Sequence, residues 1–177
     1  MPYNSLIHNR NSIRLQGYDY SSEGAYFLTI CTYQHRQMFG KIENGIMYLS
    51  QFGRIVQTEW EKSASIRSEI ELVAYVIMPN HIHAIVIIYG RGVRPNAPTD
   101  QNTFSGLKPK TIGSLIAGFK SSVTKQINLL RNSPGKPVWQ RNYWDHIIRD
   151  DEAYDIIVDY INSNPVNWKN DQLFTSS

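Results

Sequence analysis

The stretch that decides the fold is VIMPNHIHAIVII, residues 76–88. Two apolar runs are separated by a Pro-Asn pair, which predicts two β-strands joined by a short turn and therefore paired antiparallel. Side chains alternate across a strand, so His81 and His83 face one side of the sheet and Ile82 faces the other. Two imidazoles on one rigid face can share a metal ion, although packed histidines are an alternative that the pair alone leaves open.

Outward from this hairpin, hydrophobic periodicity and turn residues predict alternating strands and helices. In chain order they are a strand over 25–33, a hairpin around Asn44 and Gly45, a helix over 51–65, strands over 70–78 and 81–88, a helix over 111–130, a strand over 138–149, and a helix from 151 to 163 or 164. Without the first hairpin and the last helix, the order is βαββαβ, in which four antiparallel strands carry two helices on one face. The expected fold class is therefore α+β, a ferredoxin-like split βαβ with an added β-hairpin and a C-terminal helix.

The size of the chain predicts one domain. With 177 residues, 41% hydrophobic and 12% aromatic, it can bury one sizeable core. We expect an N-terminal arm over 1–22, a domain over 23–169 with a flexible basic loop over 89–110, and a C-terminal tail over 170–177. The single cysteine, Cys31, excludes an internal disulfide and a cysteine-based zinc cluster. No apolar run approaches the roughly 18 residues of a membrane span, and the start is unlike a signal peptide, so no membrane partner and a cytoplasmic location are expected.

Charge is distributed unevenly along the chain, although the net charge is only +3. Between residues 89 and 142 there are nine Lys and Arg against one acid, Asp100, a local balance of 9 − 1 = +8. The acids gather instead in 43–71 and 145–159. Such segregation favours a polyanionic partner, nucleic acid above all, with a solvated basic surface as the alternative.

The last predicted helix carries two polar residues on its apolar stripe. Tyr160 and Asn164 are four residues apart, so they lie on one face, one turn above the other. Spacing alone also fits an ordinary amphipathic tyrosine and an asparagine that ends the helix before Pro165.

Several motifs in order resemble one family. They are GYDY at 17–20, GAYFLTI at 24–30, MPNHIH at 78–83, VWQRNYWDHIIR at 138–149 and YINSNP at 160–165. Together they resemble the HUH-type single-tyrosine transposases, and within them the branch of REP-associated tyrosine transposases, named for repetitive extragenic palindromes. The resemblance covers roughly residues 8–169, so the predicted domain over 23–169 corresponds to an HUH transposase domain.

This resemblance implies roles for four residues. His81, His83 and Asn164 would bind a divalent metal, and Tyr160 would be the nucleophile. The chain has Asn followed by Pro at the third ligand, as the REP-associated branch does, where insertion-sequence transposases have Gln. Mg²⁺ or Mn²⁺ is the expected ion, with zinc as a further candidate, because two imidazoles and one amide oxygen form a mixed donor set. A second tyrosine nucleophile is not obvious, since Tyr154 is six residues before Tyr160 and on a different helical face.

The implied activity is that of a metal-dependent single-stranded DNA endonuclease and strand transferase, which forms a 5′-phosphotyrosine intermediate at sites next to DNA hairpins. The expected partner is single-stranded DNA with a hairpin or palindrome, bound by a monomer or a homodimer. Candidate DNA contacts are Arg10, Arg14, Tyr18, Tyr20, Arg91, Arg94, Lys108, Lys110, Lys120 and Arg141. The alternatives are a palindrome-binding protein that does not cleave, and a zinc hydrolase built on the same histidine pair.

Three aromatic residues and one histidine remain open. Trp139, Tyr143 and Trp144 are candidates for stacking on bases, with at least one of them expected in the core. His146 is either a core or capping residue or a group that supports the metal site.

Overall fold

A computed structural model describes residues 23–89 and 111–175. Four strands form one antiparallel sheet: β1 (Gly24–Cys31), β4 (Ile70–Ile77), β5 (His81–Ile88) and β6 (Trp144–Ile148), in the order β4-β5-β1-β6. This order, with a helix between β1 and β4 and another between β5 and β6, is the ferredoxin-like split βαβ arrangement. The predicted fold class is therefore confirmed. The arm over 1–22 and all of the basic loop after Tyr89 lie outside the described residues.

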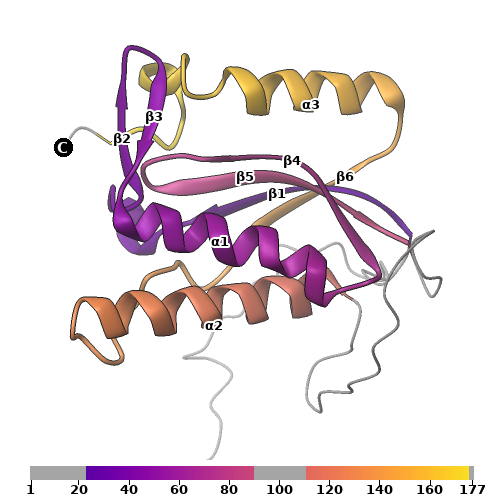
Figure 1. Cartoon of the computed structure of the whole chain (residues 1–177). Helices are drawn as coiled ribbons and strands as arrows, with labels where there is room; N and C mark the ends of the chain where they lie inside the picture. The colour runs from indigo at the N-terminus through magenta and orange to yellow at the C-terminus, as the bar shows by residue number, and fades with distance from the viewer. Residues whose placement is uncertain (1–22, 90–110, 176–177) are drawn as a thin grey trace, which may run out of the picture.

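The sheet is covered on both faces, as Figure 1 shows. Helices α1 (Gln51–Ile66) and α2 (Ile112–Leu130) pack on one face over the larger core. In this core, the rings of Trp60 and Phe119 meet edge to face with centroids 5.0 Å apart. Helix α3 (Asp151–Ser163) covers the other face over a smaller core, which contains Phe27, Ile85 and Ile161.

Strand alternation decides which side chains of β5 face which helix. Ile82 and Ala84 belong to the core under α1 and α2, whereas Ile85 belongs to the core under α3. His81 and His83 share the parity of Ile85, so they lie on the α3 face of the sheet. The histidine pair and the helix that carries Tyr160 are thereby on the same side of the molecule.

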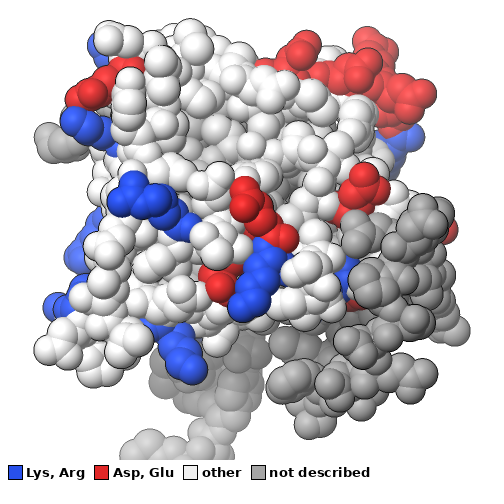
Figure 2. Space-filling view, viewed as in Figure 1, with Lys and Arg blue, Asp and Glu red and all other residues white. Residues whose placement is uncertain are grey.

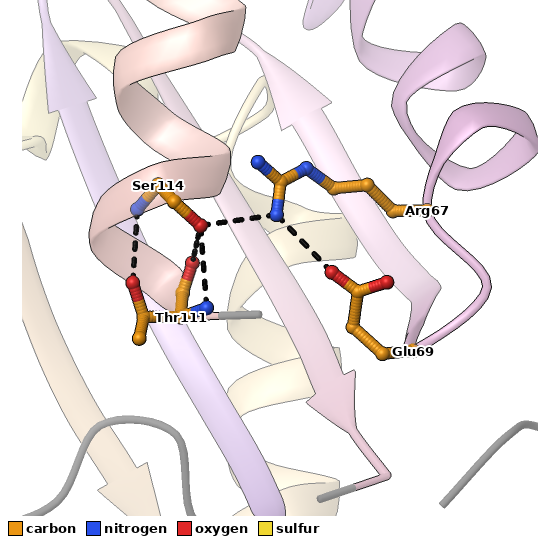
Figure 3. Close-up of polar contacts among 4 residues, drawn as sticks. All are labelled: Arg67, Glu69, Thr111 and Ser114. Atoms are coloured by element: carbon orange, nitrogen blue, oxygen red, sulfur yellow. Dashed lines mark hydrogen bonds and ion pairs between the residues drawn. The ribbon is translucent and has the colours of Figure 1, made fainter. Parts of the chain in front are cut away.

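Each long helix begins at a capping residue. Ser50 Oγ accepts a hydrogen bond from the Gly53 N–H at 3.1 Å, and Asp150 Oδ1 accepts one from the Ala153 N–H at 2.8 Å. Thr111 and Ser114 bond reciprocally at the start of α2. Figure 3 shows that Arg67, from the turn after α1, donates to both Ser114 and the buried Glu69, which ties the end of α1 to the start of α2.

The predicted peripheral hairpin consists of β2 (Gly40–Glu43) and β3 (Ile46–Leu49). The turn residues Asn44 and Gly45 have φ values of 52° and 75°, so both take the left-handed conformation that a tight two-residue turn requires. Asn-Gly adopts this conformation at low cost, which is why the dipeptide is a strong hairpin signal.

The strand predicted over 138–149 is wrong in its first half. Only Trp144–Ile148 pairs as β6, and Trp139 makes a single bridge with Thr32 beyond the end of β1. Between them, Lys120 Nζ on α2 donates to the carbonyls of Gln140 and Asn142, each at 2.9 Å. A lysine distant in sequence thus takes backbone acceptors that a continuous strand would have used.

The start of α1 requires glycine at position 53. A Cβ there would lie 2.1 Å from the Phe39 carbonyl oxygen, whereas a Cβ at Gly118 on α2 meets nothing within 4 Å. We expect Gly53→Ala to lower the free energy of unfolding by about 1–3 kcal/mol through overpacking. Gly118→Ala, the matched control, is expected to raise it by about 0.5–1 kcal/mol because Gly is a poor helix former. Urea denaturation measures both, and equal effects of the two substitutions would contradict the steric explanation.

Within the described residues, no helix is both long enough and apolar enough to cross a membrane.

Candidate metal and nucleophile site

His81 has one ring nitrogen fixed and the other unpartnered. Its Nδ1 lies 2.8 Å from Asn80 Oδ1. Asn80 Nδ2 donates to the carbonyls of Leu173 at 2.7 Å and His35 at 3.3 Å, so the amide oxygen must be the atom that faces His81. The proton therefore sits on His81 Nδ1, and Nε2 carries a lone pair. This Nε2 is buried and has no hydrogen-bond partner among the described residues.

His83 is held in a similar way. Its Nδ1 lies 2.9 Å from Thr29 Oγ1 on the neighbouring strand β1, where Thr29 is the register partner of His83. Its Nε2 lies 3.1 Å from the hydroxyl of Tyr160. The two imidazole centroids are 4.4 Å apart. Both rings thus turn their Nε2 atoms toward the space under α3, the orientation that a pair of metal ligands needs.

Burial keeps both histidines neutral. It lowers the pKa of His81 to about 2, with the charges of His83 and His35 adding to the effect. It also lowers the pKa of His83 to about 4, although the Asp171 carboxylate acts in the opposite direction. Neutral imidazole is the form that binds a metal ion, so the site does not have to lose a proton before it accepts a cation.

Tyr160 lies at the edge of the same space and is 43% exposed. Besides its contact with His83, its hydroxyl lies 3.4 Å from Asp171 Oδ2. Partial burial raises the pKa of Tyr160, and the Asp171 carboxylate raises it further. The phenol is therefore protonated at neutral pH in the absence of additional positive charge.

Asn164 is buried, and only the nitrogen of its side-chain amide has a hydrogen-bond partner among the described residues. Its Nδ2 donates to Asp171 Oδ2 at 3.2 Å, while its Oδ1 is buried without a hydrogen-bond partner among residues 23–89 and 111–175. Asn164 also stands at the C-terminal end of α3, the position that the alternative interpretation gave it. The two interpretations are compatible, because the backbone ends the helix while the side chain points into the site.

Asp171 was missed by sequence reasoning. A short 3-10 helix (η2, Trp168–Asn170) reverses the chain after α3 and brings Asp171 back to the histidines. A carboxylate oxygen of Asp171 and a ring nitrogen from each of His81 and His83 all lie within 4.8 Å of one another. No local pattern marks Asp171, which was placed in the predicted tail over 170–177. Residues up to 175 lie against the body of the protein, since Asn80 donates to the carbonyl of Leu173 and Gln37 to that of Thr175.

The donor set fits a divalent cation. Two buried atoms with lone pairs, His81 Nε2 and Asn164 Oδ1, have no hydrogen-bond partner within the described part of the chain, and an unsatisfied buried polar atom costs about 1–3 kcal/mol. His81 belongs to a group that also contains His83 and the Asp171 carboxylate, and Asn164 is hydrogen-bonded to that carboxylate. Imidazole nitrogen with amide and carboxylate oxygen suits Mn²⁺ and, less well, Mg²⁺, which prefers oxygen alone.

A cavity of about 700 Å³ adjoins the site. Its lining includes His83, Tyr160 and Asn164, together with Gln140 and Trp144. Trp144 is 44% exposed and its ring is parallel to that of His146, with centroids 5.8 Å apart. A space of this size, with an aromatic wall and amide groups, admits a phosphate and an adjoining nucleoside.

The predicted DNA contacts fall into two groups. Arg10, Arg14, Tyr18, Tyr20, Arg91, Arg94, Lys108 and Lys110 lie outside the described residues. Arg141 is exposed beside the cavity-lining residues Gln140 and Asn142. Lys120 is largely buried, with its ammonium on the two loop carbonyls, and burial lowers its pKa to about 8. The structure therefore gives Lys120 a role in holding the segment before β6, through the carbonyls of Gln140 and Asn142.

The remaining open residues are also placed. Trp139 is buried against Phe39 and Phe119, as expected for one of the three aromatics. Tyr143 and Trp144 line the cavity. His146 is exposed on β6, so it is not a core residue, and it is absent from the cavity lining.

Known proteins are similar to this chain in sequence and in fold. The chain is 42% identical over 177 residues to a Haemophilus influenzae protein named only "Uncharacterized protein", and the match covers 97% of each chain. It is 24% identical over 152 residues to a "Putative REP-associated tyrosine transposase" of the same organism, covering 84% of this chain and 73% of the other. A solved structure, "Structure of the REP associates tyrosine transposase bound to a REP hairpin", matches with a TM-score of 0.61 at 22% identity, over 89% of this chain and 74% of that one. The chain matches no model of a known protein family.

The resemblance to the REP-associated tyrosine transposases drawn from the motifs is confirmed, since proteins of that description are similar to this chain in fold and in sequence. The chain belongs to the same family as the 42% identical Haemophilus influenzae protein.

Proposed function

We propose that the protein is a metal-dependent enzyme that nicks and rejoins single-stranded DNA next to a hairpin, with Tyr160 as nucleophile and His81, His83 and Asn164 as metal ligands. The observation that carries the proposal is the position of the Tyr160 hydroxyl, 3.1 Å from His83 Nε2, beside the unpartnered donors of His81 and Asn164. The hairpin partner is inferred from the structural relative, which is described as bound to a REP hairpin.

In the proposed reaction, Tyr160 Oη attacks the scissile phosphorus. A bond forms between Oη and phosphorus, the bond to the 3′ oxygen breaks, and the phenolic proton is lost while the 3′ hydroxyl gains one. A divalent cation, when bound, would polarise a non-bridging oxygen of the phosphate and favour the phenolate. The 5′-phosphotyrosine conserves the bond energy, so attack by a 3′ hydroxyl reverses the step and rejoins a strand without ATP.

The charges around the site indicate how the strand approaches. Figure 2 shows acidic side chains gathered at the end of the molecule where α3 begins. Asp151, Glu152, Asp155 and Asp159 are exposed on this helix and would repel phosphate. We therefore expect the strand to enter through the cavity beside β6, where Arg141 is exposed, rather than along α3.

The test is an adduct assay. The protein is incubated with an oligonucleotide that carries a hairpin and a single-stranded flank, with Mn²⁺ or Mg²⁺, and run on a denaturing gel. A covalent protein–DNA species is expected with metal and none with EDTA. Tight hairpin binding without an adduct under any divalent metal would overturn the proposal and favour the non-cleaving palindrome-binding protein.

A further inference from the structure

We propose that Asp171 is a fourth metal ligand, delivered by the chain reversal after α3, so that metal binding and docking of residues 168–175 stabilise each other. The inference rests on the metal site of the proposed function and adds a residue that none of the sequence motifs contains. Three features of the site support it.

The first feature is that Asp171 is anchored as the other donors are. His81 and His83 each use Nδ1 on a neighbouring group and leave Nε2 toward the site, and Asn164 uses Nδ2 and leaves Oδ1. Asp171 Oδ1 accepts the Leu173 N–H at 2.6 Å, which fixes the carboxylate, and Oδ2 lies on the site side, where it also accepts from Asn164 Nδ2 at 3.2 Å. Ligands oriented by a partner on their other polar atom are a general property of protein metal centres.

The second feature is charge. The two imidazoles and the amide are neutral, so they would leave a buried dication uncompensated, which is costly. Asp171 is the acidic member of the group whose ligand atoms lie within 4.8 Å of one another. A carboxylate also increases the affinity of the site for Mg²⁺ and Mn²⁺, since both accept oxygen donors.

The third feature is the contact between Asp171 and Tyr160. The Tyr160 hydroxyl lies 3.4 Å from Asp171 Oδ2 and 3.1 Å from His83 Nε2. A cation held by the carboxylate and the two imidazoles would therefore lie beside the hydroxyl that the proposed reaction uses.

The experiment measures Mn²⁺ affinity without DNA, from the electron paramagnetic resonance signal of free Mn²⁺. Loss of a residue that only orients a metal ligand lowers metal affinity about 10–100-fold, and loss of a ligand itself should cost at least as much. Asp171→Asn is therefore expected to weaken Mn²⁺ binding at least about tenfold. The control, Asp159→Asn, removes the same charge from an exposed position on α3 and is expected to leave affinity within about twofold. Equal affinity of the wild-type protein and Asp171→Asn would overturn the inference.

A second measurement uses only the wild-type protein, so it is decisive even if the variant does not fold. Hydrogen exchange of the Leu173 amide, which Asp171 anchors, is expected to slow when Mn²⁺ is added. Unchanged exchange at saturating Mn²⁺ would contradict the inference. The outcomes also separate the two proposals. A wild-type protein that binds no divalent ion contradicts the metal requirement of the proposed function. Mn²⁺ binding that is unchanged in Asp171→Asn contradicts only the role of Asp171 as a ligand.

Discussion

Replacing Tyr160 by Phe is expected to abolish the covalent adduct, with a fall of more than about 10³-fold in the rate of cleavage. The substitution removes one oxygen, the atom that would form the bond to phosphorus. The ring contacts are retained, because Phe can keep the edge-to-face packing of Tyr160 on Phe27 at 6.0 Å and on His83 at 5.1 Å. Hairpin binding and thermal stability are therefore expected to change little.

The matched control for this prediction is Tyr154→Phe. Tyr154 is on the same helix but packs in the small core under α3 and is absent from the cavity lining. Its variant is expected to form the adduct at the wild-type rate in the same gel assay. An adduct that persists in Tyr160→Phe would place the nucleophile elsewhere.

Replacing His81 by Ala is expected to have the second largest effect, a loss of Mn²⁺ affinity of more than about 100-fold together with loss of the adduct. The removed Nε2 is a buried donor without a protein partner among the described residues, so in the metal-free protein it contributes no hydrogen bond. The free energy of unfolding without metal falls only through the loss of ring packing and of the contact with Asn80. The metal-induced rise in melting temperature should disappear in the variant, since stabilisation by a ligand depends on its affinity.

His146→Ala is the control for this second prediction. His146 lies on the same face of the sheet but is exposed and stacks on Trp144, outside the cavity lining. Its variant is expected to bind Mn²⁺ as the wild-type protein does. Unchanged Mn²⁺ affinity in His81→Ala would remove His81 from the set of ligands.

The fold was predictable where neighbouring residues settle the structure. Alternation placed His81 and His83 on one face, and Asn44-Gly45 selected the tight turn. The prediction failed at residues 138–143. There the aromatic and β-branched composition favoured a strand, but the carbonyls of Gln140 and Asn142 are bonded to Lys120 from another element. Local propensity carries no information on such a partner.

The sequence by itself determined the order of the elements, the shared face of the two histidines, and the shared face of Tyr160 and Asn164, because each depends on a fixed repeat along one strand or helix. Only the tertiary structure decided that these two faces meet under α3, and that Asp171 joins them. The reason is that a contact between residues 81 and 171 depends on the packing of β5 against α3 and on the reversal at η2. Neither is encoded within a single element.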